Sequence, residues 1–176
     1  MNAPLNLVIA GCGLLGGSFG LALRGRPDLR RILWARSPAA REWALRSGAA
    51  DDVCERPEDA FSQADLTIMA LPIPVICDFM RRYASVWRKG SVVSDMGSVK
   101  GVICRTAEAA LIPKGVVFIG GHPMAGTEKS GFRNAFPSLF RGADVFLCPG
   151  SNADMRAVDE LSSLWMSLHT HVIVID

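Results

Sequence analysis

Near its start the chain reads Leu5-Asn6-Leu7-Val8-Ile9-Ala10-Gly11-Cys12-Gly13-Leu14-Leu15-Gly16, and this stretch decides the expected fold. The apolar run to Ala10 predicts a buried strand, and a helical stretch begins at Leu14. Between them, in G-x-G-x-x-G, Gly11 permits a tight turn, Gly13 lets the backbone approach a pyrophosphate, and Gly16 allows close helix packing. The stretch therefore predicts a dinucleotide site, with the cofactor contacted by Gly11, Gly13, Leu14, Leu15 and Gly16.

Apolar runs alternate with segments of helical periodicity along the rest of the chain. The expected strands are Leu5–Ala10, Arg31–Ala35, Leu66–Leu71, Ser91–Ser94, Val116–Ile119, Asp144–Leu147 and His171–Ile175. The expected helices are Leu14–Leu23, Ala39–Ser47, Pro74–Trp87, Val99–Leu111 and Ala153–Leu168. The strands lack polar alternation, which is expected when helices cover both faces of a sheet. This pattern predicts one α/β domain over residues 1–176, of the Rossmann type, with a doubly wound and mostly parallel sheet.

Composition limits the classes of function. Hydrophobic residues make up 49% of the 176 residues, and the net charge of +2 gives no sign of a nucleic-acid or membrane partner. The five cysteines are widely spaced and lack a C-x-x-C pair, which indicates free thiols in a reducing cytosol and no metal site. We find no targeting segment and expect a cytoplasmic protein. Because the chain ends at Asp176 directly after an apolar strand, we expect the natural protein to continue.

The residues after the second expected strand predict the cofactor. An NAD site usually carries Asp or Glu there, about 20 residues beyond the glycine motif. This chain has Ala35, followed by Arg36 and Ser37. Since no carboxylate repels a 2′-phosphate and a guanidinium can bind one, we expect NADP, with NAD as the alternative. Arg36 could also be one of many surface arginines. Leu71 at the end of the third expected strand, Pro72 in the turn after it, and Ser98 complete the expected cofactor site.

A histidine follows the apolar run Val116–Ile119, within the segment Gly120–Gly131. His122 should therefore emerge at the carboxyl end of a strand, where ligands bind in open α/β sheets. An imidazole titrates at about pH 6.5 and can take or give a proton near neutrality. The alternative is a loop histidine that caps a neighbouring group.

A third segment, Ser94–Lys100, also follows an expected strand. Ser98 is a good N-cap candidate for the next helix, and this structural role is the alternative to a functional one. Because the carboxyl ends of parallel strands meet at one edge of the sheet, we expect this segment, the glycine motif and the His122 segment to form one crevice.

Three motifs together resemble the prephenate/arogenate dehydrogenases of tyrosine biosynthesis. They are G-C-G-L-L-G-G-S at Gly11–Ser18, D-M-G-S-V-K at Asp95–Lys100 and G-G-H-P-M-A-G-T-E-K-S-G at Gly120–Gly131. The first is generic to dinucleotide enzymes, whereas the other two are specific. The resemblance covers essentially the whole chain as the amino-terminal nucleotide-binding domain. It implies oxidative decarboxylation of prephenate or arogenate to 4-hydroxyphenylpyruvate or tyrosine, for which the residues after the second expected strand predict NADP as the cofactor.

The resemblance also implies roles for individual residues. His122 would be the catalytic base for the substrate's ring hydroxyl, and Ser98 would hold the same hydroxyl and orient the histidine. Thr127, Glu128 and Lys129 would line or gate the substrate pocket.

The two carboxylates of prephenate need cationic partners. The nearby candidates in this chain are Lys100, Lys129 and Arg133. Relatives continue into a helical carboxyl-terminal domain that forms a homodimer and supplies further cationic residues. Two other functions stay open: another Rossmann reductase such as a hydroxyacid dehydrogenase, and a non-catalytic dinucleotide sensor.

Overall fold

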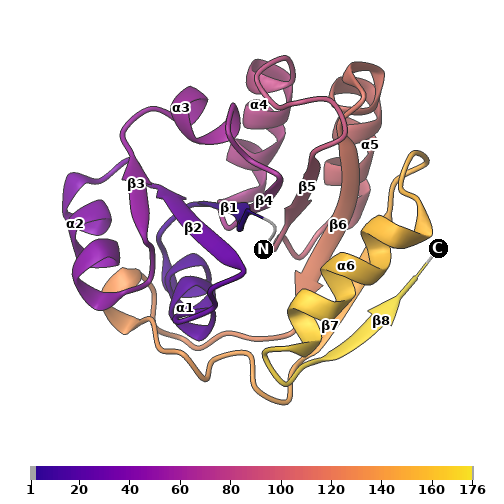
Figure 1. Ribbon diagram of the computed structural model, residues 1–176. Helices are drawn as coiled ribbons and strands as arrows, with labels where there is room; N and C mark the ends of the chain where they lie inside the picture. Colours follow the sequence, from indigo (N-terminus) through magenta and orange to yellow (C-terminus); the bar gives the residue numbers. More distant parts are fainter. Residues whose placement is uncertain (1–2, 176) are drawn as a thin grey trace.

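The computed structural model describes residues 3–175, in which eight strands form one sheet in the order β3-β2-β1-β4-β5-β6-β7-β8 (Figure 1). The strands are β1 (Leu5–Ala10), β2 (Leu29–Trp34), β3 (Asp52–Cys54), β4 (Leu66–Met69), β5 (Val92–Asp95), β6 (Val117–Pro123), β7 (Asp144–Pro149) and β8 (His171–Val174). The α-helices are α1 (Leu14–Ala22), α2 (Pro38–Ser47), α3 (Pro57–Phe61), α4 (Ile73–Tyr83), α5 (Lys100–Ala110) and α6 (Met155–Met166). Two short 3₁₀ helices are η1 (Ile112–Lys114) and η2 (Phe132–Asn134).

The direction of winding reverses at β1. From β1 the chain builds β2 and β3 on one side, then returns to build β4 on the other. Both neighbours pair in parallel with β1, so Ala10 lies between Trp34 and Met69. Such a reversal opens a crevice at the carboxyl ends of the strands, where ligands bind. The order and the parallel pairing confirm the predicted doubly wound, Rossmann-type fold; β7 runs antiparallel to β6.

Helices cover both faces of the sheet, as predicted. One face packs under α1, α2 and α6, with Phe19 and Trp165 in contact at a ring-centroid distance of 4.8 Å. The other face packs under α3, α4 and α5, where Phe61 stacks on Trp87 at 4.4 Å. The Trp87 indole donates to Thr67 Oγ1 at 2.9 Å, so its buried N–H is satisfied. Two buried cores thus hold the strands rigidly behind the carboxyl edge.

The strand β3, the helix α3 and the two 3₁₀ helices were not predicted, and β6 extends beyond its predicted end. The strand β3 and the helix α3 have three and five residues, too few to show a period in sequence. The strand β6 continues beyond Ile119 to Pro123, because Gly121 pairs with Leu147 and His122 pairs with Phe146 of β7. The histidine therefore lies in the last residues of a strand rather than in a loop.

The predicted capping role of Ser98 is wrong. The helix α5 begins at Lys100, its N-cap is Val99, and no side chain caps it. The preceding turn is closed instead by the Asp95 carboxylate, which accepts the Gly97 N–H at 2.8 Å. Ser98 is exposed. The other predicted bounds differ from the observed ones by up to four residues, as in α4, which ends at Tyr83. Within residues 3–175, no helix combines the length and apolar character needed to cross a bilayer.

Candidate active site

The glycine motif forms a tight turn between β1 and α1. Gly11 has φ +108°, a backbone conformation that favours glycine, and a Cβ there would collide with the Ala70 carbonyl of the neighbouring strand end. Its N–H donates to the Trp34 carbonyl at 2.8 Å. Gly13 is the N-cap of α1 without a side-chain cap, and a Cβ on it would meet nothing within 4 Å. No N-cap side chain therefore accepts from the first N–H groups of α1, and the space beside Gly13 is open, as a phosphate site requires.

A crevice of about 280 Å³ opens beside this turn, between the first turn of α1 and the ends of β4 and β5. Its lining residues are Gly13, Leu14, Leu15, Ala70, Leu71, Pro72, Met96, Lys129, Ser130 and Gly131. The structure thus brings together five predicted cofactor residues and Lys129, a predicted substrate residue. The open face of Gly13 and the free helix terminus fit the pyrophosphate of a dinucleotide.

The predicted 2′-phosphate residues lie beside the turn rather than in the crevice lining. Ala35 is buried at the end of β2, whereas Arg36 and Ser37 are exposed. The Ser37 hydroxyl accepts the Ala40 N–H at 3.4 Å, which caps α2 and leaves its own hydrogen free to donate. The Arg41 guanidinium donates to the Ala35 carbonyl at 2.7 Å and pairs with Glu55. Among the residues described, no carboxylate pairs with Arg36.

His122 is half-buried, and its Nδ1 lies 3.2 Å from the Gly97 carbonyl oxygen. A carbonyl oxygen only accepts hydrogen bonds, so Nδ1 must carry a hydrogen. In the neutral ring the lone pair then lies on Nε2, which is the form that a general base needs. The histidine thus contacts a neighbouring backbone group through Nδ1, and this contact leaves Nε2 as the ring nitrogen that can accept a proton.

A buried ion pair lies next to His122. Asp95 is fully buried and accepts hydrogen bonds from the Gly97 N–H at 2.8 Å, the Gly121 N–H at 3.2 Å and Lys100 Nζ. Burial raises the pKa of the Asp95 carboxyl, while the Lys100 ammonium and the two N–H donors oppose that rise. Lys100 also donates to the Gly121 carbonyl at 2.6 Å. It is therefore engaged within the protein, contrary to the expectation that it could meet a substrate carboxylate.

The other predicted substrate residues are exposed at the same edge. Ser98 directly follows Gly97, whose carbonyl contacts His122, and it lies just beyond the end of β5. Thr127 and Glu128 lie in the segment after β6, where Thr127 Oγ1 accepts the Lys129 N–H at 3.2 Å. Thr127 and Glu128 are not among the residues that line the crevice, whereas Lys129 is.

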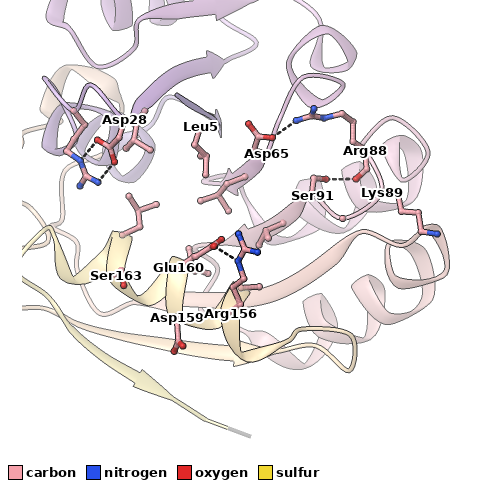
Figure 2. A pocket seen from close by; sticks show the side chains of 18 residues that line it. Leu5, Asp28, Asp65, Arg88, Lys89, Ser91, Arg156, Asp159, Glu160 and Ser163 are labelled. Atoms are coloured by element: carbon pink, nitrogen blue, oxygen red, sulfur yellow. Dashed lines mark hydrogen bonds and ion pairs between the residues drawn. The ribbon is translucent and has the colours of Figure 1, made fainter. Parts of the chain in front are cut away.

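A hollow of about 890 Å³ lies at the opposite edge of the sheet, at the amino ends of β1, β4 and β5 (Figure 2). Several of its charged side chains pair with one another: Arg88 with Asp65 at 2.5 Å, and Arg156 with Glu160 at 2.8 Å (Figure 2). The glycine turn and His122 lie at the carboxyl ends of the strands, so this hollow is not part of their site.

Comparison with known proteins identifies the family. The family model described as "Prephenate dehydrogenase, nucleotide-binding domain" matches residues 19–174. The chain belongs to the prephenate dehydrogenase family. Prephenate dehydrogenase of Bacillus subtilis is 32% identical over 169 residues, which cover 95% of this chain and 45% of the relative. That of Lactococcus lactis is 33% identical, with 97% and 46% covered. The chain thus spans a little under half the length of these family members.

Solved structures of the family share the fold. Synechocystis arogenate dehydrogenase superposes with a TM-score of 0.89 at 25% identity, over 97% of this chain and 59% of that one. Prephenate dehydrogenase from Aquifex aeolicus, solved with hydroxyphenyl propionate and NAD+, gives 0.87 at 27% identity, over 99% and 61%.

For this family member, sequence reasoning missed several residues of the candidate site. Asp95 was quoted in a motif without a role for its side chain, Lys100 was expected to meet a substrate carboxylate rather than Asp95, and Met96 was not expected in the crevice. The available signal was a carboxylate directly after an apolar strand: a side chain buried there needs a cation, and Lys100 is the nearest one in sequence.

Proposed function

We propose that this chain is the nucleotide-binding part of an enzyme that oxidatively decarboxylates prephenate or arogenate with NADP, giving 4-hydroxyphenylpyruvate or tyrosine. The observation that carries the proposal is His122, whose protonated Nδ1 and free Nε2 stand at the carboxyl edge beside a glycine-lined crevice. Relatives named prephenate, arogenate and cyclohexadienyl dehydrogenase support this substrate class.

In the proposed reaction a bound nicotinamide would supply the acceptor for the hydride that leaves the carbinol carbon of the substrate. His122 Nε2 takes the proton of the ring hydroxyl, so this oxygen becomes a carbonyl. The Gly97 carbonyl accepts from Nδ1–H and favours the imidazolium that forms. The bond from the ring to its carboxylate then breaks, and its electrons complete the aromatic ring as carbon dioxide leaves. The phenolate oxygen takes the proton back from His122.

We assign the other side chains supporting roles. Ser98 is exposed next to Gly97, where its hydroxyl can hold the same substrate oxygen. Lys129 lines the crevice and offers a cation for a substrate carboxylate, with Thr127 and Glu128 on the same exposed segment. The first N–H groups of α1 bind the pyrophosphate, which orients the cofactor over the carboxyl edge.

The preference for NADP rests on the residues after β2. The relative from Aquifex aeolicus was solved with NAD+, so the preference is proposed for this chain alone. No carboxylate stands at Ala35, and the Arg36 side chain and Ser37 hydroxyl are both accessible. A guanidinium and a hydroxyl match the geometry of a phosphate. The N–H groups at the start of α2 add a favourable dipole.

The substitution Arg36→Ala should therefore raise the dissociation constant of NADP about tenfold, since a charge-assisted hydrogen bond contributes about 1.5–3 kcal/mol. The dissociation constant of NAD should stay unchanged, because NAD has no 2′-phosphate. Titration calorimetry with both nucleotides measures the two constants. Arg46→Ala, an exposed arginine that pairs with Glu42, is the control. Tighter binding of NAD than of NADP by the unaltered chain would contradict the proposed preference.

The reaction itself is tested by following reduced nicotinamide absorbance with prephenate and arogenate, each with NADP and with NAD. The chain is assayed alone and fused to the remaining half of a relative. Turnover in either form identifies substrate and cofactor together. Nucleotide binding without turnover in both forms would contradict the proposal and favour a sensor. The expected cytoplasmic location and the homodimer formed through a further domain remain predictions, the second testable by light scattering.

A further inference from the structure

The ends of β5 and β6 are joined by side chains where their backbone ladder stops. The last residues paired in register are Ser94 and Ile119. Beyond them Asp95 Oδ1 accepts the Gly121 N–H at 3.2 Å, and Lys100 Nζ donates to the Gly121 carbonyl at 2.6 Å. The ion pair thus holds both backbone polar groups of the residue that precedes His122.

The same carboxylate also holds the partner of the histidine ring. Asp95 Oδ2 accepts the Gly97 N–H at 2.8 Å, and the Gly97 carbonyl faces His122 Nδ1 at 3.2 Å. A Cβ on Gly97 would lie 2.7 Å from Ile103 Cδ1 and 3.0 Å from Asp95 Oδ2. A larger residue than glycine would therefore push the carboxylate away. Asp95 therefore fixes the position of the residue before His122 and also that of the carbonyl that the imidazole contacts.

The position of Lys100 opposes the ordinary preference of a helix. It is the first residue of α5, at the positive end of the helix dipole, where a cation is unfavourable. Its side chain is only 17% exposed, so the ammonium loses most of its hydration as well. The buried Asp95 carboxylate explains why Lys100 stays there despite the unfavourable dipole and the lost hydration. A buried carboxylate requires a cation beside it to remain charged.

We propose that Asp95 and Lys100 are positioning residues that hold His122 in the Nδ1–H tautomer and so keep its Nε2 free as the base. Only the catalytic meaning of this tautomer rests on the proposed function, because the hydrogen-bond chain exists without substrate. Loss of either charge should release the Gly97 turn and the end of β6 together. The ring would then lose its fixed acceptor and populate the Nε2–H tautomer.

Nitrogen-15 NMR of the imidazole ring reports the tautomer directly. The chain has three histidines, so a His122→Asn spectrum assigns the His122 signals. At about pH 9, where imidazoles are neutral, the unaltered chain should show Nδ1–H. The variants Asp95→Asn and Lys100→Met should shift the signals toward Nε2–H, whereas Lys100→Arg, which keeps the cation, should retain Nδ1–H. Lys114→Met makes the same charge change at an exposed site and is the control.

Circular dichroism first establishes that each variant is folded. If Asp95→Asn fails to fold, two measurements still test the inference. They are the tautomer of the unaltered chain and the difference in tautomer between Lys100→Met and Lys100→Arg. An Nε2–H ring in the unaltered chain, or an unchanged ring in a folded charge variant, would overturn the inference. In the extended enzyme, which is the chain fused to the remaining half of a relative, turnover of Asp95→Asn should fall roughly 10- to 100-fold with unchanged NADP affinity. A tautomer shift without turnover in any form would contradict the proposed function and leave this inference standing.

Discussion

Replacing His122 by asparagine should lower the turnover number by about 10²–10⁴-fold, the usual contribution of a positioned general base. The asparagine amide is polar and can still donate to the Gly97 carbonyl, so the ends of β5 and β6 should keep their positions. It cannot take up a proton at neutral pH. The NADP dissociation constant should not change, because His122 lies outside the residues that line the crevice. Steady-state kinetics with the extended enzyme measure the effect.

A matched control comes from His169→Asn. His169 is exposed and has φ 60°, a left-handed conformation that asparagine tolerates better than most residues. This variant makes the same chemical change with no expected cost in folding or turnover. If His122→Asn keeps turnover within about threefold of the control, the histidine is not the base, and the mechanism proposed above is wrong.

The fold was predictable because its decisive signals are local. The apolar run to Ala10, the glycine turn and the helix from Leu14 are consecutive, and the order of apolar runs implied a parallel sheet. The missed elements β3 and α3 depend on tertiary contacts instead. The three residues of β3 become a strand by pairing with β2, as Val53 does with Leu33. No window of sequence that short carries a period.

The candidate site was predictable in its motifs and not in its hydrogen bonds. The positions of Gly13 and His122 follow from the rule that ligands bind at the carboxyl edge. Helix capping was the alternative role of Ser98, because serine commonly caps helices, but the Asp95 carboxylate closes that turn instead. That competition depends on the register between β5 and β6, which brings Gly121 within reach of the carboxylate. Registers between distant strands are not encoded in a local pattern.

The structural and binding roles of the glycine turn can be separated by making the same change, glycine to alanine, at Gly13 and at Gly16. Gly13 has φ −98°, which alanine adopts freely, and a Cβ there would meet nothing within 4 Å. At Gly16 a Cβ would overlap the Gly11 carbonyl and lie 3.1 Å from Ala70 Cβ. Gly13→Ala should therefore leave stability unchanged, whereas Gly16→Ala should destabilise the fold by about 1–3 kcal/mol, as overpacking does.

Cofactor binding should respond differently at the two positions. The methyl group of Gly13→Ala would stand in the crevice where the pyrophosphate approaches, so the NADP dissociation constant should rise about 10- to 100-fold at unchanged Tm. Gly16→Ala should lower Tm by roughly 2–12 °C and weaken binding through the displaced turn. Calorimetric melting and NADP titration of both variants give the four values. Wild-type NADP affinity in Gly13→Ala would mean that the cofactor does not approach the backbone at this turn, which would remove the main physical reason for placing the pyrophosphate there.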